Sequence, residues 1–428
     1  MKKNIGILSF RIAGTDGVSL EIKKWITVLE DMGHQCFFLA GELDTPKKQS
    51  YLYEELHFLH PIVQKISDQC FGEQLRPQLL TESIHDFKNK IKLVIIQFIR
   101  KFNIDLLIAE NILSIPINLP FSIALAEVIQ ETGIKAVGHH HDFFWERPRF
   151  MVNCIWDYLN SVFPPALRWI SHTVINSSAQ QQLALRRGIS SLLIPNVMDF
   201  KNPPTGIDEY NKDLRKELGV ADDELFVLQP TRIVPRKGIE HAIEVLARLP
   251  RKSVLVISHS SGDEGNDYLH RVEEYARFMK VKTIFKSDRI NETRSTKKGK
   301  KIYALQDLYP HADFVTYPSL MEGFGNAFLE TVYFRKPILI NNYPIYAYDI
   351  KPLGFKAVEI EGFVTQHTVD HILKVLDDPR KRQKMVDTNY ELGKRYFSYH
   401  NLKLWITSLI ISLFGNGNGN SISFKRIL

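Results

Sequence analysis

Short apolar runs alternate along this chain with longer stretches in which apolar residues recur at every third or fourth position. The segment 4–10, NIGILSF, is mainly apolar, and Val18, Ile22 and Trp25 then follow at helical spacing until Gly33. A short apolar run of this kind is typical of a buried strand, and the spacing after it indicates an amphipathic helix. Because the alternation repeats, it predicts helices wrapped around a mostly parallel sheet.

The alternation occurs in two halves, which a polar stretch separates. Prolines and charges in the stretch 199–213, DFKNPPTGIDEYNKD, are typical of a linker. We therefore predict an α/β fold with two doubly wound, Rossmann-like domains in tandem. The expected strands are 4–10, 35–40, 105–110, 134–140, 172–177 and 191–196 in the first half and 225–232, 253–259, 282–286 and 312–317 in the second, with a helix at 238–249.

The predicted organisation is an N-terminal domain at 1–198, a C-terminal domain at 199–390 and a closing segment at 391–428. The first domain contains a mostly helical insertion at about 45–103, which Pro61, Gly72 and Pro77 break into pieces. The closing segment is expected to form a helix that crosses back to the first domain, followed by a flexible tail, because its last part, GNGNGNS, is of low complexity.

Composition narrows the class of protein. With 428 residues, 44% of them hydrophobic and 24% charged, the chain is typical of a globular protein with more than one core. Cys36, Cys70 and Cys154 lack metal-ligand or redox spacing, so reduced thiols in a cytoplasmic protein are expected. The first apolar run is too short for a signal peptide, and no segment approaches the ~18 apolar residues of a spanning helix.

The formal net charge of +7 allows an anionic small molecule, nucleic acid or an acidic membrane surface as partner. Charge alone does not choose among these, and it leaves peripheral membrane contact open. In doubly wound sheets ligands bind beyond the carboxyl ends of the strands. The loops that follow the predicted strands are therefore where the chemistry is expected.

The first such loop contains Gly14 and Gly17, which follow a strand and open a helix. Backbone amides at a helix start can approach a phosphate group. The spacing does not fit the dinucleotide motif G-x-G-x-x-G, and a plain tight turn is the alternative.

Two further loops of the first half carry polar residues. In GHHHD an extended backbone places His139 and His141 on one face and His140 on the other. A hydrogen-bonding or catalytic histidine and a structural cluster are both open, whereas a metal site would need ligands from elsewhere, and no acidic or H-E-x-x-H metal motif is present. The other loop carries Glu110, Asn111, Ser114 and Asn118, which can contact an acceptor or cap the following helix.

The second half has a basic loop and a glutamate loop. Arg232, Arg236 and Lys237 lie between a strand and a helix, where a guanidinium group and an ammonium group suit a departing diphosphate; a solvated basic turn is the alternative. In SLMEGFGNAFLE, 319–330, two glutamates lie eight positions apart around a glycine turn. One can hold a sugar hydroxyl and the other a ribose diol, although either alone can be a solvated side chain.

Together these loops resemble the retaining, nucleotide-sugar-dependent glycosyltransferases of family 4, which have the GT-B fold with two domains facing a cleft. The resemblance covers nearly the whole chain, and E-G-F-G-N-A-F-L-E stands in place of the family's E-x7-E motif. It implies that His141, Glu322, Arg232 and Lys237 are catalytic, that Gly17, Arg232, Lys237, Gly323, Phe324, Gly325, Asn326 and Glu330 bind the donor, and that Glu110, Asn111, Ser114, His139 and Asp142 bind the acceptor.

The resemblance also assigns roles within these sets. Gly17 contacts the diphosphate, Arg232 and Lys237 neutralise it, Glu322 holds the donor sugar and Glu330 the ribose, while His141 lies close to the transferred sugar. The chain departs from the family pattern where 196–199 reads N-V-M-D instead of N-G-V-D, and where Thr15 and Asp16 split the glycine pair. These departures affect the turn before the linker and the phosphate contacts.

The predicted activity is retaining transfer of a hexose from a nucleotide-diphosphate sugar, of the GDP-mannose or UDP-glucose type, to a hydroxyl of a small polar or glycan acceptor that can be anionic. No metal and no cofactor are expected. The elements 110–116 and 139–147 resemble those of family members with small polar acceptors, such as mannosylglucosylglycerate-type synthases.

Two alternatives remain at this stage. A glycan phosphorylase or a sugar-nucleotide epimerase can share the architecture. A nucleic-acid-binding protein would use the basic stretch 286–301, but that stretch lacks the interleaved aromatic residues on which bases stack, so no nucleic-acid partner is expected. We expect 286–301 to be an exposed, mobile loop.

Overall fold

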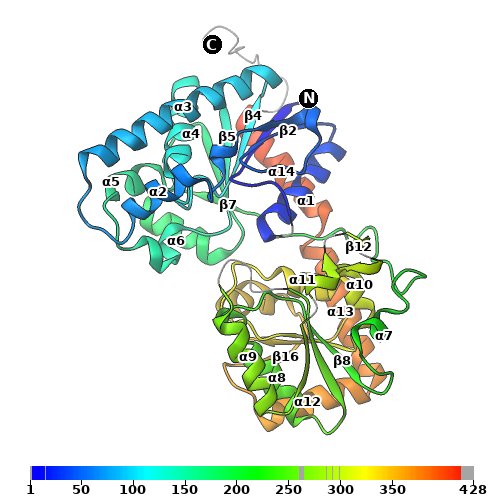
Figure 1. Ribbon diagram of the computed structural model, residues 1–428. Helices are drawn as coiled ribbons and strands as arrows, with labels where there is room; N and C mark the ends of the chain where they lie inside the picture. The colour runs from blue at the N-terminus through cyan, green and yellow to red at the C-terminus, as the bar shows by residue number, and fades with distance from the viewer. Residues whose placement is uncertain are drawn as a thin grey trace. The chain divides into compact units, whose positions relative to one another are not determined.

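The computed structural model describes residues 2–14, 16–259, 265–285, 287–291, 293–297 and 299–415. Contacts divide the chain into two compact units, Met1–Asn196 together with His400–Leu428, and Val197–Tyr399. We call them unit 1 and unit 2. Each contains a parallel sheet flanked by helices (Figure 1).

Unit 1 has a seven-stranded sheet of order β3-β2-β1-β4-β5-β6-β7, in which every neighbouring pair is parallel. The strands are β1 (Asn4–Leu8), β2 (Gln35–Ala40), β3 (Ser50–Leu52), β4 (Leu106–Glu110), β5 (Lys135–His140), β6 (Ile170–Val174) and β7 (Ser191–Leu193). The helices are α1 (Gly17–Asp31), α2 (Pro61–Cys70), α3 (Gln78–Phe102), α4 (Leu119–Thr132), α5 (Trp156–Val162), α6 (Ser177–Arg187) and α14 (Tyr399–Phe414). Figure 1 shows α3 and α4 on one face of the sheet and α1 and α14 on the other.

The segment 45–103 is mostly helical in the structure, and its breaks lie at the expected residues. Pro61 is the first residue of α2, Gly72 has a φ of +87° in the turn that follows, and Pro77 caps α3. The buried side of α3 joins the core of unit 1, with Ile84, Ile91 and Phe98 among its members. The insertion also contains β3, an edge strand that the apolar pattern does not indicate.

Unit 2 repeats the arrangement with a six-stranded parallel sheet of order β10-β9-β8-β14-β15-β16. The strands are β8 (Leu225–Gln229), β9 (Ser253–Ile257), β10 (Lys282–Phe285), β14 (Phe314–Tyr317), β15 (Ile338–Asn341) and β16 (Val358–Ile360). The helices are α7 (Leu214–Leu218), α8 (Ile239–Arg248), α9 (Asp267–Phe278), α10 (Leu305–His311), α11 (Asn326–Tyr333), α12 (Gln366–Asp377) and α13 (Pro379–Tyr396). In both sheets the strand order reverses at the first strand, β1 or β8, which is where such folds bind ligands.

The basic stretch 286–301 corrects one expectation, because most of its described residues are not a free loop. A small sheet of order β11-β13-β12 forms there, with β11 (Ile290–Asn291), β12 (Ser295–Lys297) and β13 (Lys300–Ala304). Lys286, Glu292 and Lys298 lie outside the described residues, as do Thr15 of the first glycine loop and the glycine-rich tail 416–428.

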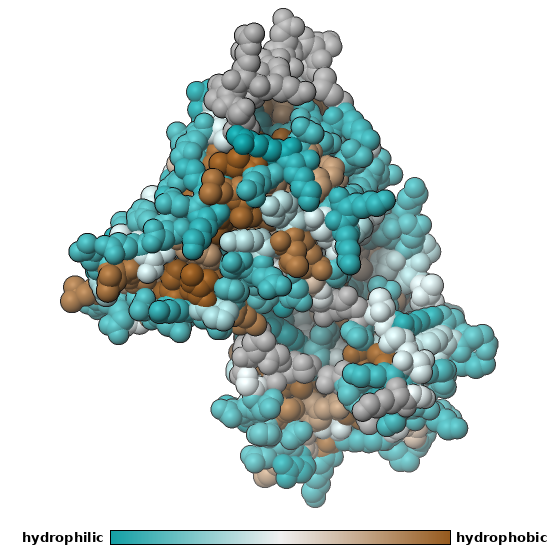
Figure 2. All heavy atoms as spheres, turned by 45° about the horizontal axis from the view of Figure 1, so that its top comes forward, coloured by the Kyte–Doolittle hydropathy of each residue, from teal (hydrophilic) through white to brown (hydrophobic). Residues whose placement is uncertain are grey.

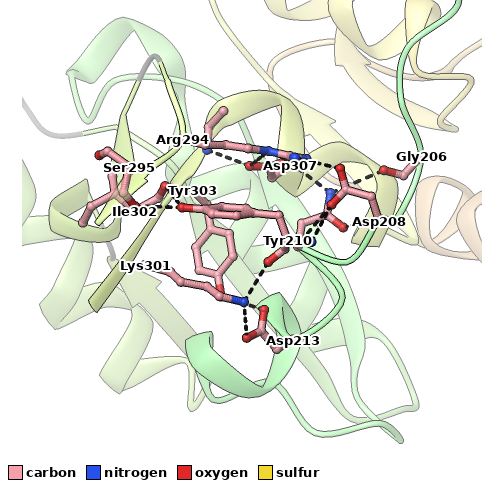
Figure 3. A network of polar contacts seen from close by, with 12 residues as sticks. Gly206, Asp208, Tyr210, Asp213, Arg294, Ser295, Lys301, Ile302, Tyr303 and Asp307 are labelled. Atoms are coloured by element: carbon pink, nitrogen blue, oxygen red, sulfur yellow. Dashed lines mark hydrogen bonds and ion pairs between the residues drawn. The ribbon is translucent and has the colours of Figure 1, made fainter. Parts of the chain in front are cut away.

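Acidic residues distant in sequence hold this small sheet (Figure 3). The Arg294 guanidinium lies 2.5 Å from Asp307 and 2.7 Å from Asp208, and Lys301 lies 2.7 Å from Asp213. The Tyr210 hydroxyl donates to carbonyl oxygens on both antiparallel strands, at 2.7 and 2.9 Å. The expected linker therefore packs against the basic stretch, and several of its charges are neutralised within unit 2.

Most of the surface in Figure 2 is hydrophilic, with apolar side chains gathered in a few places. Leu75, Leu79, Met151 and Trp156 are among the exposed large hydrophobic residues. Within the described part of the chain, no helix combines the length and the apolar character needed to cross a membrane. The three cysteines are free thiols.

Candidate functional site

The loop that begins at Glu110 and the loop that carries His139 and His141 meet at the carboxyl ends of β4 and β5. The two strands are neighbours, and Glu110 pairs with His139 in the parallel register. One carboxylate oxygen, Oε2 of Glu110, lies 2.9 Å from Nδ1 of His139 and 3.3 Å from Nε2 of His141. We call these three residues the Glu110 triad. The side chains of Glu110 and His139 are each 1% exposed and that of His141 is 10% exposed, so His141 is the least buried of the three.

The charge state of the triad follows from competition between burial and pairing. Burial by itself raises the pKa of Glu110, but the two histidines outweigh it and bring that pKa down to about 2. Burial lowers the pKa of His141. The negatively charged carboxylates of Glu110, Glu21 and Asp142 raise that pKa by more than burial lowers it, so the net shift is upward. At neutral pH Glu110 is therefore a buried carboxylate, and its surroundings favour a cation beside it.

Asn111 organises the loop around the triad. Its backbone is left-handed, with a φ of 58°, and its Oδ1 accepts the His141 amide at 2.7 Å, while its Nδ2 donates to Asp142 at 3.2 Å. Asp142 also pairs with Arg147. The hydroxyl of Ser114 is fully buried and donates to the Asn111 carbonyl at 3.2 Å. The structure thus gathers four of the five predicted acceptor residues and His141, while Ser114 supports the turn from inside.

The structural alternative holds for Asn118, which is fully buried. Its Oδ1 accepts the Phe121 amide at 3.2 Å and caps α4, and its Nδ2 donates to the carbonyls of Glu55 and Leu56. Helix capping therefore accounts for this side chain.

The glycine loop of unit 1 has a carboxylate at the helix start. Asp16 caps α1 by accepting the amides of Val18 and Ser19, both at 3.1 Å, and Arg11 pairs with it at 3.0 Å. Gly17 is the first residue of α1. A diphosphate approaching Gly17 would meet the Asp16 charge, so the cap limits the amides that this helix start can offer.

In unit 2 the basic loop and the glutamate loop lie side by side, because they follow the neighbouring strands β8 and β14. The Leu320 amide donates to the Arg236 carbonyl at 2.8 Å. Lys237 pairs with Oε1 of Glu322, and Arg236 lies 3.3 Å from Oε2. The Lys237 and Glu322 side chains are both 10% exposed. Two cations therefore grip one carboxylate at the end of the sheet, whereas Arg232 is exposed.

Opposing effects also set the pKa values in this cluster. Burial, together with the charges of Arg236 and Arg232, lowers the pKa of Lys237 against the opposing effect of Glu322, so the net shift is downward. Burial raises the pKa of Glu322, but Lys237 and Arg236 together bring that pKa below its usual range. His259, just beyond β9, has a pKa lowered to about 4 by burial and then by the charges of Lys237 and Arg232. The cluster is a cationic surface around an ionised glutamate.

The glycine turn after Glu322 has a steric cause. Gly325 has a φ of +117°, and a Cβ there would come within 2.4 Å of the Tyr343 hydroxyl. That hydroxyl donates to the Phe324 carbonyl at 2.8 Å. The Phe324 side chain is buried against Phe397, with ring centroids 5.2 Å apart, so Phe324 can offer a donor only its backbone. Gly323 is exposed before the turn, and Asn326 opens α11 after it.

Glu330 lies one turn inside α11, as expected, and a buried tyrosine orients it. The Tyr309 hydroxyl donates to Oε2 of Glu330 at 2.7 Å, and its ring stacks on Phe334 with centroids 4.6 Å apart. Tyr309 and His259 are absent from the sequence-based prediction. His259 could have been found as a polar residue at the carboxyl end of a strand, but nothing in the sequence indicates Tyr309.

Comparison with known proteins identifies the family. The family described as Glycosyl transferases group 1 matches residues 211–392. The mannosylglucosylglycerate synthase of Petrotoga mobilis is 32% identical over 94% of this chain and 99% of that protein. The chain belongs to the group 1 glycosyl transferases.

Other proteins are similar to this glycosyltransferase over a comparable share of its length. The mannosylglucosylglycerate synthase of Thermotoga maritima is 32% identical over 93% of this chain and 97% of that protein. The crystal structure of Anabaena HepE in complex with UDP and glucose has a TM-score of 0.66 and 16% identity, covering 96% of this chain and 100% of that one. The predicted GT-B fold and the prediction of a hexosyltransferase are confirmed. The family match includes both glutamates and the whole basic loop of this glycosyltransferase.

Proposed function

We propose that this glycosyltransferase moves mannose, with retention of anomeric configuration, from a GDP-mannose-type donor to a hydroxyl of glucosylglycerate or a closely related small acceptor. The observation that carries the proposal is the 32% identity, over nearly full length, to two proteins named mannosylglucosylglycerate synthase. A product of that name contains mannose, glucose and glycerate, so the acceptor would be small, polar and anionic.

Unit 2 supplies the donor site in this proposal. Arg232 and Lys237 would stabilise the charge that grows on the departing diphosphate, which is usually the largest catalytic contribution. Glu322, held ionised by Lys237 and Arg236, would accept hydrogen bonds from hydroxyls of the donor sugar. Glu330, oriented by Tyr309, would accept those of the ribose.

Unit 1 supplies the acceptor site. The least buried residue of the Glu110 triad is His141, which is supported by Glu110 and by the Asn111 side chain. No enzyme nucleophile is needed if the acceptor hydroxyl attacks the face from which the diphosphate leaves, through an oxocarbenium-like state. The leaving phosphate takes the acceptor proton. This scheme requires no metal at the diphosphate, because Arg232 and Lys237 provide the positive charge.

The test is product analysis with the purified enzyme and a panel of GDP-mannose, UDP-glucose and other nucleotide sugars, each with and without glucosylglycerate. We expect GDP-mannose and acceptor together to give a product one hexose larger than the acceptor, whose anomeric one-bond C–H coupling matches that of the donor. An inverted product would refute retention. Conversion of the nucleotide sugar without acceptor, or sugar phosphate formation from a glycan and phosphate, would favour an epimerase or a phosphorylase instead.

A further inference from the structure

We propose that Glu110, His139 and His141 form a binding site for a divalent transition-metal ion of the Zn²⁺ type. Three ligand atoms, one from each side chain, lie within 4.8 Å of one another. The sequence predicts no metal site because its histidine pair lacks further ligands nearby in the chain. The missing ligand, Glu110, comes from the neighbouring strand, where it pairs in register with His139.

Two of the three spacings between the ligand atoms already suit an ion, and all three ligand atoms lie within 4.8 Å of one another. Zinc bonds to nitrogen and oxygen of about 2.0–2.2 Å place neighbouring ligand atoms about 3 to 3.5 Å apart. The two histidine nitrogens lie 2.9 and 3.3 Å from the same Glu110 oxygen. An ion would therefore replace two existing hydrogen bonds.

The charge of Glu110 supplies the reason for a cation. Its ion-pair partners within the described chain are His139 and His141, and no lysine or arginine of that part pairs with it. Its second oxygen, Oε1, is buried without a hydrogen-bond partner among the described residues. Buried carboxylates are normally paired with a cation or coordinate a metal. An ion at the triad would satisfy the charge and can engage Oε1 as a second carboxylate ligand.

The donor set selects the class of ion. Two imidazole nitrogens and one carboxylate oxygen suit Zn²⁺, Co²⁺ or Ni²⁺, whereas Mg²⁺ and Ca²⁺ prefer oxygen ligands throughout. With three protein ligands, a fourth position stays open for water or another molecule. His141, the most exposed member, marks the side on which that position lies.

Neighbouring residues hold two of the ligands in place. The Trp25 ring packs on His139 with centroids 4.5 Å apart, and Asn111 accepts the His141 amide. The remaining nitrogen of His139, Nε2, has no hydrogen-bond partner among the described residues. Metal-bound histidines usually donate from that position, which raises their affinity. We therefore expect a reversible site rather than a permanently occupied one.

A bound ion would engage the groups that the proposed function places next to the acceptor. Zn²⁺ should then inhibit transfer, and a chelator should restore it. This consequence rests on the proposed function, whereas metal binding itself does not.

Titration of the chelator-treated, full-length protein with Co²⁺ alone tests the site, because bound Co²⁺ absorbs visible light according to its ligands. We expect one Co²⁺ per chain, displaced by Zn²⁺ and unaffected by excess Mg²⁺. His139→Gln and His141→Gln should each weaken binding at least about 10-fold. His85→Gln is the matched control, because His85 is an exposed histidine of α3 in the same unit, bonded to Tyr158.

Absence of a stoichiometric Co²⁺ spectrum in the parent, or unchanged binding in both triad variants, would overturn the site. Circular dichroism checks folding, and His141→Gln, which alters the most exposed ligand, keeps the test valid if His139→Gln does not fold. Stoichiometric Zn²⁺ binding without any effect on transfer would leave the metal site standing and would instead contradict the acceptor role of the triad.

Discussion

Arg232 and Lys237 share a loop but differ in what surrounds them. Lys237 is buried and bonded to Glu322, whereas Arg232 is exposed. If both stabilise the leaving diphosphate, Arg232→Ala and Lys237→Ala should each lower kcat, by about 100-fold, because that charge grows only as the bond breaks. Steady-state kinetics with saturating acceptor measures this. Lys300→Ala, at an exposed position of β13, is the control.

The Arg232→Ala and Lys237→Ala variants should differ in their free energy of unfolding. Lys237→Ala leaves Glu322 buried with Arg236 as its remaining cation, so its free energy of unfolding should fall by up to about 3 kcal/mol. Arg232→Ala should unfold like the parent. An unchanged kcat with only a raised donor KM in both variants would contradict the leaving-group role.

Glu330 and Tyr309 form a second residue-scale unit. Glu330→Ala should weaken binding of the free nucleoside diphosphate by about 1–3 kcal/mol, since two hydrogen bonds to a ribose are lost. Tyr309→Phe keeps the carboxylate but removes the 2.7 Å hydrogen bond that orients it, so about 1 kcal/mol is expected. Calorimetry with GDP and UDP measures both.

Tyrosine to phenylalanine preserves the ring that stacks on Phe334, so a stability effect alone does not explain a loss of affinity. A positioning role predicts a raised donor KM with kcat nearly unchanged in Tyr309→Phe. Equal nucleotide affinity in the parent and in Glu330→Ala would show that the ribose lies elsewhere.

At the scale of elements, strands were the predictable part of this fold. A strand that is buried on both faces needs apolar residues at successive positions, and the runs that become β2, β5, β8 and β9 show this directly. The polar residues that follow such strands are the candidate site residues. That rule places Glu110, His141, Arg232 and Glu322 at the carboxyl ends of strands, which is where the structure has them.

Contacts between distant segments were not predictable. The small sheet β11-β13-β12 depends on acids from 208–213 and on Asp307, and without those partners its basic residues look like a solvated loop. The same holds for Tyr309 beside Glu330. The contact between Glu110 and His139 is a third example, because it follows from the register in which β4 pairs with β5, and the sequence alone does not show that register.

The link between β5 and β6 predicts a pH dependence of stability. The Pro165 carbonyl can only accept, so His172 donates from Nε2 at 3.1 Å, and its Nδ1 accepts from Nε2 of His140 at 2.9 Å. These two hydrogen bonds need a neutral His172, because a protonated Nδ1 cannot accept. Burial lowers the pKa of His172 to about 4 and that of His140 well below its usual value.

Between the unfolded pKa near 6.5 and the folded value near 4, the unfolded chain binds a proton that the native chain does not, so stability falls as pH falls. From pH 7.5 to 5 the loss due to His172 is about 2 kcal/mol. His172→Gln keeps a donor and an acceptor without titrating, so its loss over the same range should be smaller by about that amount. Urea unfolding at both pH values measures it, and equal losses would contradict this account.

At the scale of the whole molecule, the net charge of +7 favours anionic ligands. The basic stretch that made nucleic acid an alternative has Arg294 and Lys301 paired with acids, so those charges do not form an open basic surface. The cationic groups at the end of the unit 2 sheet are the ones placed for a small anion. A nucleotide sugar fits this distribution better than a nucleic acid.

The placement of these charges leads to a prediction about metals. A diphosphate leaving group needs positive charge, and many enzymes provide it with Mg²⁺. In this chain Arg232, Arg236 and Lys237 lie on one loop at the end of the sheet, and we expect them to perform that task. Transfer should therefore proceed at the same rate in EDTA-treated and untreated enzyme, measured with donor and acceptor in metal-free buffer.

The metal site proposed for unit 1 does not alter this expectation, because an ion bound there should inhibit transfer. Loss of turnover in EDTA with recovery on adding Mg²⁺ or Mn²⁺ would show that the basic loop is insufficient, and recovery with Zn²⁺ alone would assign the Glu110 triad a catalytic metal instead.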